Sequence, residues 1–120
     1  MREPGALEIK TFAFALDILD FEAKLLLGKH YTMANQLFRC GTGIGANVRE
    51  AQEAESKADF IHKLKIANKE AEETDYFIKL CAESPHYPHP EKLTEKIQEI
   101  LRLLNAIIAT AKHNLKQRYP

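Results

Sequence analysis

The chain contains, at residues 39–51, the stretch Arg39-Cys40-Gly41-Thr42-Gly43-Ile44-Gly45-Ala46-Asn47-Val48-Arg49-Glu50-Ala51. Three of the five glycines of the 120-residue chain lie here. The apolar and small residues around them still keep a helical spacing, because they recur in steps of three and four. These residues are Ala34, Leu37, Gly41, Ile44, Val48 and Ala51. The stretch therefore predicts a helix over residues 31–54 that carries glycines in its interior.

The glycines in this segment can be explained in two ways: they form a phosphate-binding loop, or they allow a close contact with another helix. Gly41 and Gly45 are four residues apart, the small-xxx-small spacing that lets two helix backbones approach each other. Each interior glycine costs about 1 kcal/mol of helix propensity relative to alanine, so close packing has to compensate for it. A phosphate loop would need a preceding strand and a G-x-x-x-x-G-K-[ST] or G-x-G-x-x-G motif, and the sequence has neither. The pattern favours packing.

A second helix, predicted over residues 57–83, follows directly. Ser56-Lys57-Ala58-Asp59 has the form of a capping box, with a hydroxyl and an acid three residues later. The apolar seam of this helix narrows in its middle, where Ala67, Ala71 and Thr74 are small. We expect this narrow part to pack against Gly41 and Gly45 of the preceding helix.

Polar residues flank the predicted contact on both helices. Carboxylates on one helix could meet cationic and amide groups on the other and form a polar layer that fixes the register. The alternative is an exposed face with charge pairs along a single helix. The polar layer would consist of Arg39, Asn47, Arg49, Glu50, Glu70 and Glu73.

The N-terminal part of the chain predicts a helix over residues 7–27, which ends at Gly28. One apolar stripe, with the spacing of a coiled-coil seam, consists of Ile9, Phe12, Leu16, Leu19, Ala23 and Leu26. A second stripe beside it consists of Phe14, Ile18, Phe21 and Leu25. The apolar face is therefore wider than a single seam, and we expect burial on two sides, inside a bundle or across a subunit interface.

The C-terminal part predicts one loop and one helix. Pro85, Pro88 and Pro90 interrupt the helical pattern, since each proline disfavours helix at the residue before it. Pro90 suits the first position of a helix over residues 91–117. The apolar stripe of that helix is also wide.

Four helices joined by short connections predict an all-α fold, an antiparallel up-down-up-down four-helix bundle in a single domain over residues 1–120. The extra apolar width on the first and last helices exceeds what the inner seam of a monomeric bundle needs. We therefore expect a homo-oligomer.

The charge balance gives no overall case for a nucleic-acid or membrane partner, since Lys plus Arg and Asp plus Glu both number 17. The C-terminal end differs, because no acidic residue follows Glu99. Repeated around an oligomeric ring, these basic residues would give a nucleic-acid-binding rim. The rim would consist of Arg102, Lys112, Lys116 and Arg118.

The sequence gives little indication of a catalytic or metal-binding site. No Ser/His/Asp, Cys/His or phosphate-loop arrangement can be assembled from helical neighbours. A di-metal bundle needs Glu-x-x-His motifs on facing helices, and the single such motif, Glu83 to His86, has Pro85 inside it. We expect no enzyme activity, metal or cofactor, and we expect Cys40 and Cys81 to be buried thiols of a cytoplasmic protein.

Three segments resemble the bacterial four-helix-bundle family that intervening sequences within 23S ribosomal RNA genes encode. They are Gly41-Thr42-Gly43-Ile44-Gly45-Ala46-Asn47-Val48-Arg49-Glu50-Ala51, Ser56-Lys57-Ala58-Asp59-Phe60-Ile61-His62-Lys63-Leu64 and Lys69-Glu70-Ala71-Glu72-Glu73-Thr74-Asp75-Tyr76.

This resemblance implies a ring-shaped homopentamer without established enzymatic activity. It also points to the related accessory variability protein of diversity-generating retroelements, a basic pentamer that binds nucleic acid, whereas this chain is neutral. The expected function is an oligomeric scaffold associated with RNA or a ribonucleoprotein. The alternative is a protein-interaction module that does not bind nucleic acid.

Overall fold

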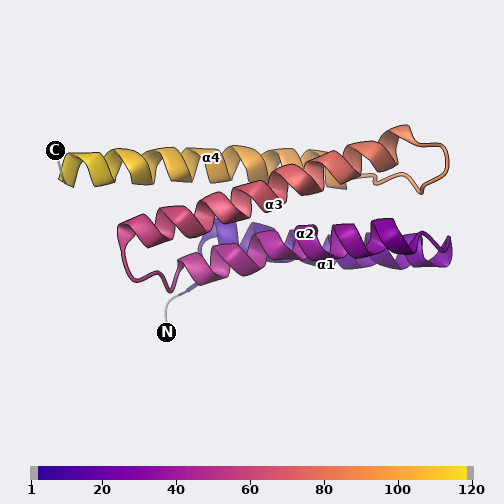
Figure 1. The fold of residues 1–120 in the computed structure, drawn as a ribbon, viewed down its shortest axis with the longest axis horizontal. Helices are drawn as coiled ribbons and strands as arrows, with labels where there is room; N and C mark the ends of the chain where they lie inside the picture. Colours follow the sequence, from indigo (N-terminus) through magenta and orange to yellow (C-terminus); the bar gives the residue numbers. More distant parts are fainter. Residues whose placement is uncertain (1–2, 119–120) are drawn as a thin grey trace.

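A computed structural model of the chain describes residues 3–118, and for Arg118 it describes the backbone alone. These residues form four α-helices and no strand: α1 (Ala6–Leu27), α2 (Tyr31–Ala51), α3 (Lys57–Glu83) and α4 (Leu93–Arg118). Successive helices run in opposite directions along a molecule of 53 × 29 × 20 Å (Figure 1). The predicted all-α fold with four helices is confirmed.

The helices form a four-cornered arrangement. Each helix packs against the helices before and after it, and α4 closes the arrangement against α1. Within the described residues, α1 does not pack against α3, nor α2 against α4. The α1–α2 pair therefore lies opposite the α3–α4 pair.

Local hydrogen bonds explain where the helices begin and end. Ser56 accepts a hydrogen bond from the Asp59 amide at 3.0 Å, as the capping-box sequence predicts. The Asp59 carboxylate accepts one at 3.1 Å from the amide of Glu55, one residue before the predicted donor Ser56. α2 ends at Ala51 and not at residue 54, because the amides of residues 52–54 bond to carbonyls three residues back and tighten the chain into a turn.

α4 begins later than residue 91. Glu91 has a φ of 45°, outside the range of a right-handed helix, so Pro90 cannot open the helix. Pro90 is instead buried in the connection, and α4 starts at Leu93. In the same connection the ring of Tyr87 contacts that of His30 at a tilt of 51°, with 4.5 Å between ring centroids. This contact joins the loop to the turn between α1 and α2.

A single apolar core runs through the bundle, and all four helices contribute to it. On α1 the buried residues include Phe14, Ile18, Phe21 and Leu25, the second of the two predicted stripes. Cys40 and Cys81 are free and buried in this core, as expected. Burial raises the pKa of the Cys81 thiol to about 11.

Candidate functional site

The glycines of α2 stand at a close helix contact, but the partner helix differs from the predicted one. A β-carbon on Gly41 would lie 2.7 Å from Cγ1 of Ile18, and one on Gly45 would lie 3.3 Å from the carbonyl oxygen of Thr11. Both neighbours belong to α1. The prediction that Gly41 and Gly45 pack against α3 is therefore wrong, since the backbone of α2 approaches α1 at these positions.

The narrow part of α3 faces α2 at a different point. Ala67, Ala71 and Thr74 are fully buried. Thr74 donates a hydrogen bond to the Glu70 carbonyl oxygen at 2.7 Å, and its hydroxyl also lies beside the Cys40 thiol. Burial raises the pKa of Cys40, and the Thr74 hydroxyl partly offsets this rise. Thr74, in the narrow part of α3, thus contacts Cys40 of α2.

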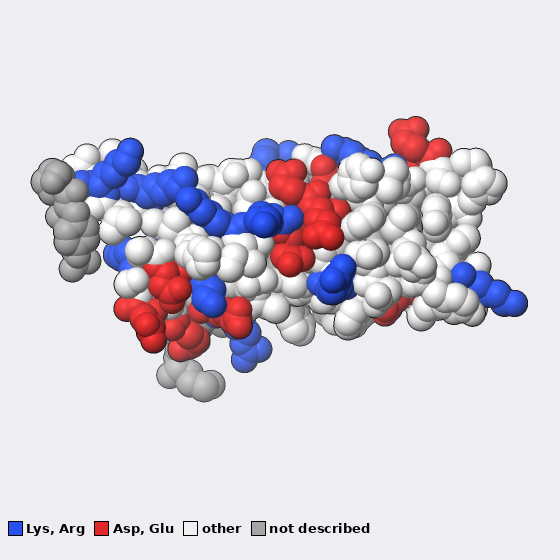
Figure 2. Space-filling model, in the orientation of Figure 1, with Lys and Arg blue, Asp and Glu red and all other residues white. Residues whose placement is uncertain are grey.

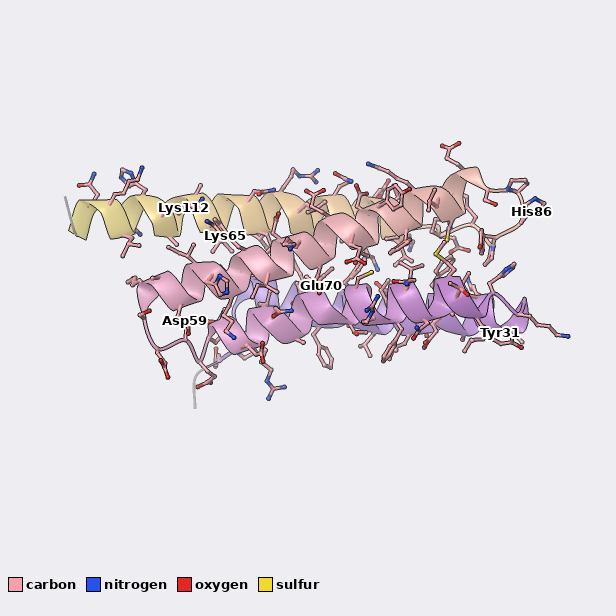
Figure 3. All side chains as sticks on the ribbon, viewed as in Figure 1. Tyr31, Asp59, Lys65, Glu70, His86 and Lys112 are labelled. Atoms are coloured by element: carbon pink, nitrogen blue, oxygen red, sulfur yellow. The ribbon has the colours of Figure 1, made fainter. Side chains whose placement is uncertain are left out.

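Gly43, which was not singled out for packing, is the glycine that faces α3. A β-carbon on Gly43 would lie 3.3 Å from the Glu70 carboxyl group. The pKa of Glu70 is raised, first by burial and then by the neighbouring Glu73, while Arg39 and Lys69 act in the opposite direction. Glu70 and Arg39 are thus electrostatic neighbours across the α2–α3 contact, and Glu70 points toward α2 in Figure 3.

The predicted polar layer is brought together only in part. Asn47 donates to the Gly43 carbonyl oxygen of its own helix at 2.8 Å, and Arg39 donates to Gln36 at 2.8 Å. Arg49, Glu50 and Glu73 are exposed. Of the six residues, Glu73 and Arg39 act electrostatically on Glu70, and among these three only Glu70 is half-buried.

Large apolar side chains lie exposed on α1 and α2. The first predicted stripe of α1 is on the outside, with Phe12 66%, Ile9 58% and Leu16 50% exposed. Phe38 of α2 lies on the side of its helix that carries Gly41 and Gly45 and therefore faces α1. We call this surface the apolar α1–α2 face; it consists of Ile9, Phe12, Leu16, Leu19, Leu26, Leu27, Tyr31 and Phe38.

Ion pairs occupy the other edge of α1, where it meets α4 and the connection that precedes α4. Lys10 pairs with Glu99, Asp17 with Lys96 at 2.5 Å, and Lys24 with Glu91 at 3.6 Å. Lys10, Asp17 and Lys24 are spaced by seven residues, so they share one side of α1. The apolar α1–α2 face and the ion pairs therefore lie on different sides of the same helix.

A groove of about 570 Å³ opens between α3 and α4. Asn68 donates to Asn105 across it at 3.4 Å, and Ile108 beside them is buried. We call it the α3–α4 groove; its lining is His62, Lys65, Ile66, Asn68, Lys69, Asn105, Ile108 and Lys112.

Two lysines face each other across this groove. Lys65 of α3 and Lys112 of α4 both line it, and the nearby Lys65 ammonium group lowers the pKa of Lys112. Lys116, one turn further along α4, lowers it further. Figure 3 shows Lys65 and Lys112 at the facing edges of the two helices.

The predicted basic rim is only partly located at this groove. Lys112 lines it, and Lys116 lies next to Lys112. Arg102 lies beside Glu99, whose pKa is lowered first by Lys10 and to a smaller degree by Arg102, and it does not line the groove. The side chain of Arg118 lies outside the described residues.

Sequence reasoning missed the contribution of α3. Lys65, Lys69 and His62 line the groove from this helix. A usable indication was present, because residues 57–69 contain four lysines and a single acid, Asp59, whereas residues 70–75 are rich in acids. Figure 2 shows the result: a band of basic residues over the C-terminal half of α4 reaches onto α3, and acidic residues gather beyond it.

The described residues form neither a metal-ion site of clustered ligands nor a membrane span. Within residues 3–118, no three His, Cys, Asp or Glu side chains come together in a way that could hold a metal ion. Over the same part of the chain, none of the helices has the length and apolar character needed to cross a membrane.

Comparisons with known proteins agree with the fold. The sequence model of the 23S rRNA-intervening sequence protein family matches residues 8–106. A crystal structure of a protein with unknown function, from the S23 ribosomal protein family of Bacteroides thetaiotaomicron VPI-5482, superposes with a TM-score of 0.81. The two chains are 39% identical, and the match covers 86% of this chain and 98% of the other. No curated protein matches this chain.

Proposed function

The chain belongs to the 23S rRNA-intervening sequence protein family, and on this premise we propose that it is a non-enzymatic cytoplasmic scaffold. Copies of it assemble into a homo-oligomeric ring, a pentamer by the resemblance described above, and the ring associates with RNA or a ribonucleoprotein. One observation carries the proposal. The bundle has a large apolar surface on one pair of helices and a basic groove on the opposite pair.

The apolar α1–α2 face supports assembly. Exposed apolar side chains are ordinary when they are scattered, but a continuous stripe along a helix marks an interaction surface. On α1 the stripe keeps heptad-like spacing over almost the whole helix, which is the pattern of a helix packed on a second partner. A second copy of the chain is the occupant that a ring requires.

The basic surface supports association with RNA. The chain is neutral as a whole, but the opposite charges are segregated, and a groove lined by lysines attracts a polyanion locally. Lys112 and Lys116 lie beyond residues 8–106, the part that matches the family. In a ring, each copy would add one such surface.

Size-exclusion chromatography with light scattering, run with and without nuclease, measures assembly and bound nucleic acid together. We expect a mass of about five chains that nuclease treatment does not change. Filter binding of structured ribosomal RNA across a salt series then tests the RNA association. Affinity that is absent at low salt, or that does not respond to salt, would contradict it.

A protein-interaction module is the second candidate. Tyr76 is 60% exposed and Leu80 is 40% exposed on α3, outside the apolar α1–α2 face. These side chains could contact another protein after the ring has formed. A partner that is retained in a pull-down after nuclease treatment, in the absence of RNA binding, would favour this candidate.

A further inference from the structure

We propose that the α3–α4 groove is a binding site for an unpaired RNA strand, held by its phosphates on Lys65, Lys69 and Lys112. This inference rests on the proposed association with RNA and names the surface and the form of RNA. It differs from the predicted rim, because two of the three lysines belong to α3 and Arg102 takes no part.

Like charges converge on the groove. Lys65 and Lys112 lie close enough for one ammonium group to affect the titration of the other, and the lining of the groove contains no acidic residue. Both side chains are exposed and long, so they could turn away from each other into water. Their convergence on one groove creates a local positive potential that an anion between them would neutralise.

The charges of the groove repeat along one wall. Lys65 and Lys69 are four residues apart on α3, and Lys112 lines the α4 wall. Four residues of helix span about 6 Å, so the α3 wall carries two cations one above the other. A ligand with repeated negative charges can contact all three lysines, whereas an isolated phosphate reaches fewer of them. This arrangement favours a polyanion.

Between its lysines the groove has both polar and apolar side chains. The amides of Asn68 and Asn105 can each donate and accept hydrogen bonds, and their mutual bond is long, at 3.4 Å. Amides pair with the edges of bases and with ribose hydroxyls, and the imidazole of His62 offers a ring for stacking. An acidic peptide would use the lysines and could pair its backbone with the amides. The preference for a nucleic acid therefore rests on its repeated phosphates and on its bases, each of which has an edge for the amides and a face for His62.

The size of the groove favours unpaired nucleotides. A volume of 570 Å³ is within the range, roughly 300–1,000 Å³, of sites that hold a small ligand. Single nucleotides can enter such a space, but an RNA duplex would touch only the rim. Unpaired bases are also the form of RNA whose edges are accessible to side chains.

Fluorescence anisotropy of the full chain with a labelled 12-nucleotide RNA, single-stranded or annealed to its complement, tests the inference. The groove variant is Lys65→Gln with Lys112→Gln. The matched control is Lys29→Gln with Lys92→Gln, which removes two exposed lysines outside the groove. Circular dichroism verifies that each variant keeps its helices.

We expect the wild-type chain to bind the single strand more tightly than the duplex, and the groove variant to lose about tenfold or more in affinity. The plot of log K against log salt should become shallower by about 1.4, because two phosphate contacts are lost at about 0.7 each. The control variant should keep nearly all of its affinity. Asn68→Ala with Asn105→Ala should weaken binding without changing the salt slope.

Several results would overturn the inference. If the groove variant binds RNA as the wild type does, while Arg102→Gln with Lys116→Gln loses binding, the groove is not the site and the proposed RNA association stands. Preference for the duplex, or tighter binding of a labelled glutamate-rich peptide, rejects the unpaired strand as the ligand. Absence of any RNA binding by the wild-type chain rejects both the groove and the proposed function.

Discussion

The α1–α2 and α3–α4 pairs lie on opposite sides of one bundle but have different surfaces. α1 and α2 approach to backbone contact at Gly45, so their outer side chains merge into one apolar face. α3 and α4 contain no glycine, and the facing asparagines and lysines leave a groove between them. The size of the residues at the seam thus decides whether two helices present a continuous face or an opening.

Large side chains in place of the glycines at the α1–α2 contact should have the largest effect, because they would force the two helices apart. In Gly41→Leu, the β-carbon alone would clash with the fully buried Ile18 at 2.7 Å. We expect the free energy of unfolding to fall by about 3 kcal/mol or more. Gly45→Leu should act in the same way, because the Thr11 backbone cannot move aside. Urea unfolding followed by circular dichroism measures both variants.

Gly43→Ala is the matched control on the same helix. Its β-carbon would meet only the Glu70 carboxyl group at 3.3 Å, and that half-buried side chain can shift. We expect stability to rise by about 0.5–1 kcal/mol through helix propensity. If Gly41→Leu unfolds at the same urea concentration as the wild type, the close contact with α1 is wrong.

Placing charges on the apolar α1–α2 face should separate the copies and leave the groove intact. Phe12→Glu with Leu16→Glu removes two large side chains that assembly would bury, each worth about 1.5–3 kcal/mol. We expect the mass from light scattering to fall to that of one chain, with unchanged helical content. Tyr76→Glu, on α3, should keep the wild-type mass. A wild-type chain that is already monomeric would contradict the assembly.

The reaction rates of two thiols can be used to compare solvent access to the core with solvent access to the groove. Cys81 has a pKa of about 11, raised from 9.0 by burial. A thiol introduced by Asn105→Cys, at an exposed position in the groove, should have an ordinary pKa of about 8.5. At pH 8 we expect the added thiol to react with a disulfide reagent more than about 100-fold faster than Cys81, since the thiolate is the reactive form. Equal rates would mean that the core opens as freely as the groove.

The same thiol gives the stability a pH dependence. Because folding raises the pKa of Cys81, the unfolded chain loses this proton at lower pH than the folded chain does. Stability from this group is full below pH 9.0 and falls as the pH rises toward 11. Cys81→Ala should make the decline in urea midpoint between these values less steep.

The smallest expected effect is on the melting temperature. It should have opposite signs for a lysine of the α3–α4 groove and a lysine of the α1–α4 edge. Lys65→Gln removes repulsion against Lys112, so the melting temperature should rise slightly at low salt. Lys10→Gln removes the attraction to Glu99 and should lower it slightly. Both changes should disappear in about 1 M salt, where screening extends over only about 3 Å. A decrease with Lys65→Gln would show that Lys65 stabilises the fold.

The sequence predicted the helices well because apolar periodicity and capping residues act locally. Ser56 and Asp59 show this at the start of α3, where the predicted cap and the observed one agree. The later start of α4 depends on the positive φ of Glu91, and the identity of this residue gives no indication of that conformation.

The candidate site was harder to predict because it depends on which helices face each other. Ile9 and Phe14 both belong to apolar stripes, and only the position of α2 and α4 decides that Phe14 is buried. The glycines gave the correct type of contact and the wrong partner for the same reason. Lys65 and Lys112 are 47 positions apart in the printed sequence (112 − 65), so their proximity appears only in three dimensions.

Three ion pairs from α1, two to α4 and one to the connection before it, also restrict how the chain can close. Along α1 the charges run positive, negative, positive at Lys10, Asp17 and Lys24. Their partners carry the opposite order, with Glu99 and Lys96 on α4 and Glu91 in the connection. If α4 slipped by one pair, Lys10 would meet Lys96, and Asp17 would meet Glu91. Exposed pairs add little stability, but like charges placed opposite each other are penalised. In a crowded ring, this alternation would favour each chain packing its own α4 in one alignment over exchanging misaligned helices with a neighbour.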